Sequence, residues 1–197
     1  MTDQGYTLFD TAIGRCAIAW TAGGIAALQL PEASDGATRA RLRRRHADLG
    51  EVPPPPEVAR AIGTIVALLQ GEASDLSGIA LDMGPVPAFN RQVYEIARRI
   101  PPGRTRTYGE IATELGDRAL ARDVGQALGQ NPFAIIVPCH RVLGANGKVG
   151  GFSANGGAET KLRMLTIECA LLGSRPTLFD SLPAMARPSR SRVGRTR

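Results

Sequence analysis

The chain has 197 residues, of which 43% are hydrophobic, and it carries a formal net charge of +6. This length supplies one good-sized hydrophobic core or two small ones. No stretch approaches the roughly 20 uninterrupted apolar residues of a membrane helix. Since the start, Met1 to Gly5, also lacks the basic residues of a secretory signal, a globular cytoplasmic protein is expected.

The cysteines and histidines exclude two further classes. Cys16, Cys139 and Cys169 are odd in number and widely spaced, which is typical of free thiols rather than of a disulfide framework. The two histidines, His46 and His140, form no close pair of metal ligands. We therefore predict neither a metal site nor a cofactor.

The positive charge is concentrated in the middle and the tail of the chain. Residues 1–90 carry 7 basic and 10 acidic groups, whereas residues 91–163 carry 11 basic and 6 acidic groups. Residues 181–197 contain five arginines and no acidic residue. This asymmetry favours a polyanionic partner, although a basic composition alone indicates only nonspecific attraction.

The first 30 residues predict an antiparallel meander. Short strand-like runs cover residues 6–9, 15–21 and 25–30, and glycines separate them. Residues 39–49 have a helical pattern with little apolar face, so this arginine-rich segment is expected to lie in solvent. Prolines at 53–56 then end it.

A helix is predicted over residues 57–70, because apolar residues recur there at helical spacing and Gly71 is suited to a C-terminal cap. It should pack on the meander. After a candidate strand at 79–83, the stretch Gly84-Pro85-Val86-Pro87 favours a domain boundary. The expected domains are residues 1–85, residues 86–176 and an arginine-rich tail, 177–197.

Three helices are predicted beyond the boundary. The first covers 90–100, the second begins at a capping box formed by Thr107 and Glu110, and the third covers about 117–130. A tight connection between the last two is the helix-turn-helix pattern. With the meander, these helices predict an α+β fold.

The third helix has two contrasting faces when projected at about 100° per residue. Its apolar face consists of Leu120, Val124, Ala127 and Leu128, and its opposite face consists of Arg118, Arg122, Gly125 and Gly129. A glycine inside a helix costs roughly 1 kcal/mol relative to alanine. Two glycines on one face therefore predict the close approach of another molecule, for which a nucleic-acid strand is a candidate.

Residues 133–137 are apolar throughout and predict a buried strand or core segment that ends at Pro138. Cys139 and His140 should then emerge from the core at a chain turn. A glycine-rich loop over 144–157 and a final helix over 159–172 follow. Residues 183–197, rich in proline, serine and arginine, are expected to be disordered and either to add affinity for a polyanion or to have no role.

The Cys139–His140 pair is the candidate reactive site, and a buried structural cysteine is the alternative. Cationic neighbours such as His140 and Arg141 are expected to lower the pKa of the thiol toward neutrality, which favours the nucleophilic thiolate. Adjacent side chains on an extended backbone point to opposite sides, so His140 should reach the sulfur only through water or a sharp turn. Glu168 is a candidate for fixing the imidazole tautomer, with a solvated surface glutamate as the alternative.

Five segments resemble, in the same order, those of the O6-alkylguanine-DNA alkyltransferases, or methylated-DNA–protein-cysteine methyltransferases. The segments are Arg106 to Ala112, Arg122 to Gly125, Asn131-Pro132, Pro138-Cys139-His140-Arg141-Val142 and Gly147 to Ser153. The similarity is strong over residues 88–172 and weaker from residue 5, and the tail lies outside it. The resemblance implies a ribonuclease H-like N-terminal domain and a C-terminal winged helix-turn-helix domain.

The resemblance implies DNA repair by direct, irreversible SN2 transfer of an alkyl group from O6 of guanine to Cys139, once per chain and without a cofactor. O4-alkylthymine is a further candidate substrate. The implied partner is double-stranded DNA containing O6-alkylguanine, bound by a monomer through the minor groove with the target nucleotide flipped out. Such a protein would associate with the nucleoid.

The resemblance also assigns roles to single residues. Cys139 looks like the nucleophile, His140 like a base that acts through water, and Glu168 like the group that orients it. Asn131 resembles a hinge asparagine, and Tyr108 a tyrosine that crowds the target phosphate and contacts the guanine.

The remaining implied residues contact DNA. Arg122 looks like the finger that fills the vacated stack, and the backbones of Val142 and Ser153 match positions that contact the base. Further DNA contacts are expected from Thr107, Gly125 and Arg141.

Several positions depart from the family pattern, and rival readings remain. Asp123 places a negative charge near the DNA face, Phe152 replaces a frequent tyrosine, and the loop 153–157 is two residues longer than the shortest family loops. The rivals are an alkyltransferase-like protein, in which tryptophan replaces the cysteine, a dimeric helix-turn-helix regulator that reads the major groove, and a cysteine hydrolase that turns over.

Overall fold

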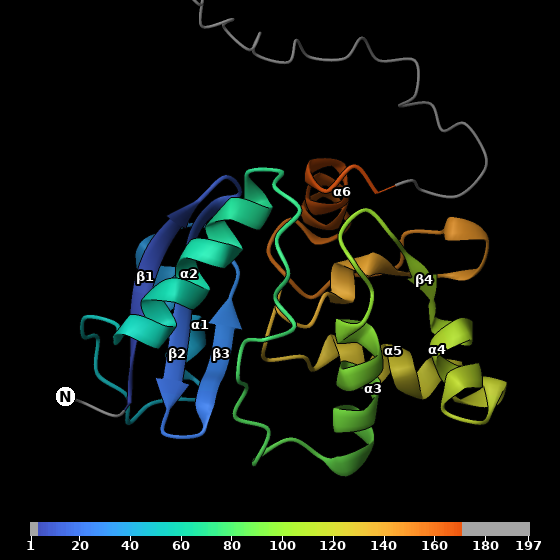
Figure 1. Cartoon of the computed structure of the whole chain (residues 1–197), viewed down its shortest axis with the longest axis horizontal. Coiled ribbons are helices and arrows are strands. Elements are labelled where there is room, and N and C mark those ends of the chain that lie inside the picture. The colour runs from blue at the N-terminus through green and yellow to red at the C-terminus, as the bar shows by residue number, and fades with distance from the viewer. Residues whose placement is uncertain (1–3, 171–197) are drawn as a thin grey trace, which may run out of the picture.

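A three-stranded antiparallel sheet begins the chain in this computed structural model, which describes residues 4–170 (Figure 1). The strands β1 (Gly5–Thr11), β2 (Gly14–Thr21) and β3 (Gly24–Gln29) follow one another in the order β1-β2-β3. The pairing is interrupted by a bulge between Ala19 and Trp20. The predicted meander is therefore confirmed.

Both faces of the sheet are covered by a helix, with α2 (Pro56–Leu69) in front of it and α1 (Asp35–Arg43) behind it in Figure 1. Because side chains alternate along a strand, Ile18 and Trp20 belong to the large core that includes α2, whereas Ala17 and Ala19 pack with Leu42 of α1. The helices α1 and α2 therefore pack on opposite faces of β2.

The expectation that the arginine-rich segment lies in solvent is wrong. The helix α1 begins at Asp35 behind an N-cap by Ser34, and its Leu42 is buried in a small core with Leu8 and Ala19. Together with buried Thr38, this single leucine is enough to seat the helix on the sheet. The pattern looked solvated because only one of its faces carries an apolar residue.

Both edges of the sheet are covered by other parts of the chain. On the β1 side, Tyr6 N donates to Gly50 O at 2.9 Å and Val52 N donates to Tyr6 O at 3.0 Å. On the β3 side, Ile25 N donates to Ala80 O at 2.9 Å. Further along β3, Leu28 N donates to Pro132 O at 2.8 Å, so the C-terminal part of the chain also touches this edge.

The helices of the C-terminal part are α3 (Ala88–Arg98), α4 (Tyr108–Glu114), α5 (Ala121–Gly129) and α6 (Gly157–Ile167). The predicted capping box is confirmed, since Thr107 Oγ1 accepts from Glu110 N at 3.1 Å and the Glu110 carboxylate accepts from Thr107 N at 2.5 Å. A short parallel pairing joins β4 (Arg106–Thr107) to β5 (Val142–Leu143).

The third predicted helix is divided. Asp117 Oδ1 accepts a hydrogen bond from Ala119 N at 2.8 Å and caps a separate 3-10 turn over Arg118–Leu120, after which α5 begins. The final helix begins at Gly157 and ends at Ile167, earlier than expected. Residues 168–170 are not helical, and residues 171–172 of the predicted final helix lie, like the tail 177–197, outside the described residues.

The segment 133–137 is buried, but it is a turn and not a strand. Asn131 holds it at both ends, because its Oδ1 accepts from Phe133 N at 2.9 Å and its Nδ2 donates to Val137 O at 2.8 Å. Within the turn, Ile135 takes a positive φ of 71°. Residues 79–83 likewise form only an isolated bridge, between Leu81 and Ile25.

One large core runs from the sheet into the helices. Tyr94 of α3 packs edge-to-face on Phe133 with ring centroids 6.3 Å apart, and its hydroxyl donates to Ala127 O of α5 at 2.8 Å. The resulting architecture is a small antiparallel sheet with helices, a mixed α+β fold. Within residues 4–170, no helix is both long and apolar enough to cross a membrane.

Candidate active site

A single 3-10 turn, Cys139–Arg141, presents the three central residues of the site. The turn is closed by a hydrogen bond from Arg141 N to Pro138 O at 2.8 Å, and β5 follows it directly. We expected His140 to reach the sulfur only through water or through a sharp turn of the chain. The chain does make a sharp turn here.

His140 and Glu168 form a buried pair. Nε2 of His140 lies 2.9 Å from Oε1 of Glu168, and the imidazole is fully buried. Burial lowers the pKa of His140 and outweighs the opposing effect of Glu168, so the imidazole is neutral. Burial acts to raise the pKa of Glu168, but hydrogen bonds from His140 and Arg141 outweigh it and lower the value to about 2. The solvated-glutamate alternative is therefore wrong.

The pairing defines the imidazole tautomer. Because the Glu168 carboxylate can only accept, Nε2 must carry the proton and Nδ1 must carry the lone pair. Nδ1 is buried and has no hydrogen-bond partner among the described residues. The free lone pair of a neutral histidine is suited to accept a proton.

Arg141 is part of this cluster and not of an exposed surface. Its guanidinium donates to both oxygens of Glu168, at 2.7 and 2.8 Å, and to Ile100 O at 2.6 Å. The residue is only 4% exposed. The expected contact of this side chain with DNA is therefore wrong, because all of these donors point into the protein.

The pKa of the Cys139 thiol is shifted in the opposite direction to the one expected from the sequence. Burial raises its pKa above the ordinary value, and hydrogen bonding from Asn131 and the charge of Lys161 oppose this only in part. His140 is neutral and Arg141 is committed to Glu168, so neither supplies the expected cationic effect. At rest the thiol is protonated and needs a base to become a nucleophile.

Lys161 is a site residue that the sequence reasoning missed. Its side chain is fully buried, its Nζ donates to Val142 O at 2.5 Å, and it lies 5.8 Å from the ring centroid of Tyr108 and 6.0 Å from that of Phe152. One signal was available, because Lys161 lies seven residues before Glu168 and two helical turns bring such positions to one face.

Replacing Lys161 with methionine is expected to raise the pKa of Cys139 further, because the charge of this lysine favours the thiolate. The pH dependence of alkylation at Cys139 by a small reagent, followed by peptide mass spectrometry, measures this pKa. The matched control is Lys148→Met, which removes an exposed lysine from the loop that precedes α6. An unchanged profile in Lys161→Met would contradict the electrostatic role.

The other predicted residues lie around this centre or on the neighbouring face. The Tyr108 ring is partly buried, and the Thr107 side chain is engaged in the capping box. The carbonyls of Val142 and Ser153 already accept hydrogen bonds, from Lys161 and from Arg41. Any contact of these two carbonyls with a base would use the second lone pair of each oxygen.

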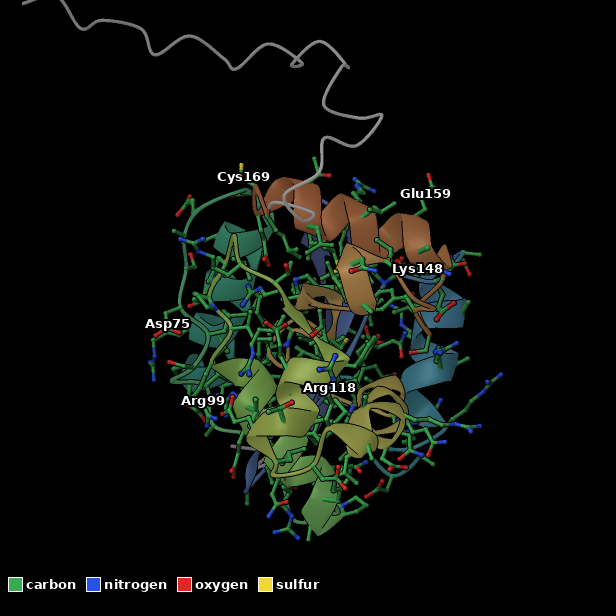
Figure 2. All side chains as sticks on the ribbon, turned by 90° about the vertical axis from the view of Figure 1, so that its right-hand side faces the viewer. Asp75, Arg99, Arg118, Lys148, Glu159 and Cys169 are labelled. Carbon is green, nitrogen blue, oxygen red and sulfur yellow. The ribbon has the colours of Figure 1, made fainter. Side chains whose placement is uncertain are left out.

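Arg122 and Gly129 are exposed on α5 and Gly125 is partly exposed, and Arg118 of the preceding turn lies on the side of the molecule that faces the reader in Figure 2. A Cβ at Gly125 would meet the Tyr108 ring only at 3.9 Å, and a Cβ at Gly129 would meet nothing within 4 Å. The protein itself therefore does not require glycine at either position. Asp123 lines a separate hollow, next to Phe89 and Asn90 of α3.

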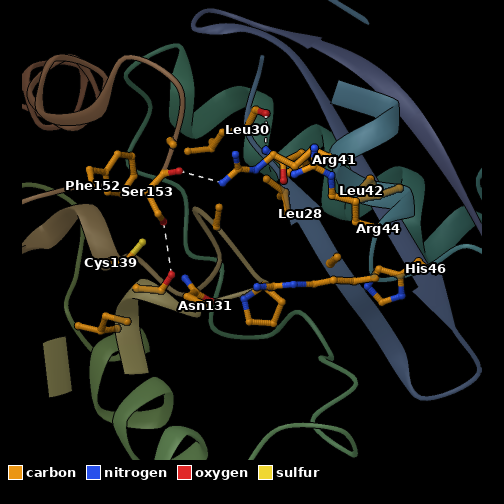
Figure 3. Close-up of a pocket in the computed structure, with 18 residues that line it drawn as sticks. Leu28, Leu30, Arg41, Leu42, Arg44, His46, Asn131, Cys139, Phe152 and Ser153 are labelled. Atoms are coloured by element: carbon orange, nitrogen blue, oxygen red, sulfur yellow. Dashed lines mark hydrogen bonds between the residues drawn. The ribbon is translucent and has the colours of Figure 1, made fainter. Parts of the chain in front are cut away.

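A cavity of about 260 Å³ adjoins Cys139 (Figure 3). Asn131, Phe152 and Ser153 line it on the C-terminal side, and residues of β3 and of the end of α1 line it on the N-terminal side. The nucleophile therefore lies in a crevice between the two parts of the chain.

These observations define a class: an α+β protein in which a half-buried thiol adjoins a buried histidine–glutamate–arginine cluster and a short exposed helix lined with glycine. Residues 88–170 match a family model described as "6-O-methylguanine DNA methyltransferase, DNA binding domain". A methylated-DNA–protein-cysteine methyltransferase of Mycolicibacterium paratuberculosis is 42% identical over 126 residues, which cover 64% of this chain and 74% of that protein. The chain belongs to the methylated-DNA–protein-cysteine methyltransferase family.

Solved structures agree with this assignment. The chain is similar to Mycobacterium tuberculosis OGT in complex with DNA, with a TM-score of 0.67 and 34% identity over 84% of this chain and 92% of that one. An O6-methylguanine DNA methyltransferase from Methanococcus jannaschii gives a TM-score of 0.60 and 28% identity, over 86% and 96% of the two chains. The likeness thus extends well beyond the helices into the N-terminal sheet.

Proposed function

We propose that this protein repairs DNA by moving the alkyl group of O6-alkylguanine onto its own Cys139. The observation that carries the proposal is the protonated, half-buried thiol on the same turn as a neutral histidine whose Nε2 is held by Glu168. The names of the relatives, which are methylated-DNA–protein-cysteine methyltransferases, support the same activity.

The chemistry follows from the tautomer of His140. Nδ1 takes the Cys139 proton through a bridging water, and the thiolate attacks the alkyl carbon in line with the bond to O6. The carbon–O6 bond breaks as the carbon–sulfur bond forms, and guanine leaves with the electron pair. We assign to Tyr108 a hydrogen bond to the departing guanine, because burial raises its pKa and its hydroxyl keeps its proton. The guanine anion then takes a proton from solvent, and the His140 imidazolium releases to solvent the proton that came from Cys139.

The product is a thioether, which thiol exchange cannot reverse because it contains no disulfide. Nothing in the proposed sequence of steps regenerates the thiol, so each chain acts once. This stoichiometric use separates the proposal from a cysteine hydrolase, which would turn over.

We propose that α4 and α5 bind the DNA as a helix-turn-helix in the minor groove. Two glycines on the exposed face of α5 offer no side chains to read the edges of bases, but they permit a close backbone approach. The target nucleotide must leave the stack, which costs a few kcal/mol. In this proposal Arg122, which is exposed on α5, enters the vacated space and offsets part of that amount.

The finer structural and cellular assignments are also proposals. They are a ribonuclease H-like N-terminal domain (1–85), a winged helix-turn-helix domain (86–176), a monomer on DNA and a cytoplasmic, nucleoid-associated location. The pairing of β4 with β5 next to α4 supports the winged arrangement. O4-alkylthymine is proposed as a second substrate.

The direct test is the mass of the intact protein after incubation with duplex DNA that contains O6-methylguanine. A gain of one methylene, mapped to Cys139 and reaching a plateau at one group per chain, is expected. A folded sample that binds the DNA and gains no mass would refute the proposed activity.

Replacing Arg122 with alanine is expected to slow transfer from duplex DNA by roughly tenfold or more, because a few kcal/mol of flipping energy would be offset less well. The reaction with free O6-methylguanine should be nearly unchanged, since no base has to be flipped. Single-turnover rates on both substrates measure the difference. Equal losses on both would refute the finger role.

A further inference from the structure

The cavity beside Cys139 has a strongly basic wall. Three arginines at the end of α1 and just beyond it line the cavity together with His46, and we call them the arginine wall: Arg41, Arg44 and Arg45. Figure 3 shows Arg41 and Arg44 on the side opposite Cys139. Among the described residues that line the cavity there is no aspartate or glutamate.

The first of these arginines is already engaged. Nη2 of Arg41 donates to Ser153 O at 2.9 Å, and its Nε lies 3.2 Å from Oε1 of Glu32. Since Ser153 belongs to the loop beside Cys139, this contact joins the wall to the C-terminal part of the chain. Arg41 therefore holds the wall next to the nucleophile.

The other two arginines have no such partner. Within residues 4–170, no carboxylate lies within ion-pair distance of Arg44 or Arg45, and both residues are exposed. The stability of α1 does not account for them either. Arg41 and Arg43 already place positive charge in the last turn of the helix, Arg44 is the C-cap and Arg45 follows it.

We propose that Arg44 and Arg45 bind phosphate oxygens of the DNA strand on either side of the flipped nucleotide, so that the N-terminal part forms a second wall of the DNA site. This inference rests on the proposed function. A nucleotide that reaches Cys139 brings its base into the cavity, while its flanking phosphates stay at the mouth. Two free guanidinium groups at that mouth match the geometry of phosphate oxygens.

The test compares the double variant Arg44→Gln/Arg45→Gln with the wild-type chain on duplex DNA containing O6-methylguanine. Each phosphate contact contributes about 0.9 to the slope of log affinity against log salt concentration. The slope should therefore become shallower by roughly two in the double variant. Transfer from the free base should not change.

The matched control is Arg60→Gln, an exposed arginine on α2, which covers the opposite face of the sheet. It removes one positive charge from the N-terminal part, half of what the double variant removes, and should leave the slope close to that of the wild type. An equal loss of slope per charge removed in Arg60→Gln and in the double variant, or no loss in the double variant, would overturn the proposal.

A second measurement locates the contact. Oligonucleotides carry one neutral methylphosphonate at each position around the lesion in turn, and affinity is measured for both proteins. At the contacted positions the neutral group should weaken the wild type several-fold and the double variant hardly at all. Equal weakening of both proteins at every position would overturn the proposal.

Two other outcomes can be told apart from a phosphate contact: binding of the adduct by the arginine wall, and failure of the proposed activity. If the double variant is impaired only on lesions whose alkyl group ends in a carboxylate, the wall binds the adduct and not the backbone, and the proposal is wrong. If the wild type binds DNA without accepting an alkyl group, the proposed activity fails. The salt slopes and the methylphosphonate pattern still decide the phosphate contact in that case.

Discussion

Replacing Cys139 with alanine is expected to abolish alkyl transfer completely while leaving the fold and DNA binding intact. The sulfur is the proposed acceptor, and no neighbouring group can replace it, because His140 and Arg141 are turned toward Glu168. The thiol lies at the edge of the core and lines an existing cavity, so its removal enlarges that cavity by only a small space. Intact-protein mass and a DNA-binding titration measure the two quantities.

The other two cysteines provide controls within the same molecule. Cys16 is buried in β2, where burial raises its pKa to about 12, and Cys169 is exposed after α6. A small alkylating reagent should therefore label Cys169 readily and Cys16 very slowly. O6-methylguanine in DNA should instead label Cys139 alone. Transfer from DNA to Cys169 in Cys139→Ala would show that the site does not select its acceptor.

Replacing Glu168 with glutamine is expected to destabilise the protein by about 3–5 kcal/mol, because removing one partner of a buried ion pair leaves the other uncompensated. The guanidinium of Arg141 would face an amide in place of two carboxylate oxygens. Denaturant unfolding measures the loss. The matched control is Glu159→Gln at the exposed start of the same helix, which should change stability by less than about 0.5 kcal/mol.

The same substitution should slow transfer by roughly 10²–10⁴-fold, the usual contribution of a general base. A glutamine amide can either accept from Nε2 or donate to it, so the imidazole loses its fixed tautomer. A variant that stays folded and transfers at the wild-type rate would show that His140 does not act as the base. Measuring the rate well below the unfolding midpoint separates this effect from the loss of stability.

The cluster also predicts how stability depends on pH. Glu168 has a pKa of about 2 in the folded protein and an ordinary value near 4.5 when unfolded. It therefore contributes stability above pH 4.5, on the order of 3 kcal/mol, that is lost as the pH falls toward 2. The pKa of buried His140 is also lowered, so the unfolded chain binds this proton first and stability starts to fall below about pH 6.5.

Local signals in the sequence predicted much of the structure. The glycine-separated strands, the capping box at Thr107 and the link between His140 and Glu168 each depend on short-range patterns or on a recognised motif. Residues 133–137 are a buried core segment, one of the two structures expected for them, and the alternative strand does not form because a neighbouring side chain bends the segment. The Asn131 side chain bonds both ends of the segment and bends it into a turn, which hydrophobic pattern alone cannot reveal.

The chemical errors share one physical cause. The expectation for Cys139 counted the charges of its neighbours in the sequence, whereas the actual field depends on where the side chains point. Arg141 turns away to Glu168, and the cation that favours the thiolate, Lys161, comes from a helix 22 positions further along the chain. A buried lysine carries no local sign of its partner, so only the folded arrangement identifies it.

The covered sheet edges have a consequence for separating the two parts of the chain. Unpaired strand edges are templates for pairing between molecules and promote aggregation. Residues 50–52 shield β1, and Pro132 shields part of β3 by accepting from Leu28. Expressed alone, residues 1–85 would lose this cover at Leu28 together with the packing of Phe133. The C-terminal part thus covers the edge of β3 and keeps this strand from pairing with strands of other molecules.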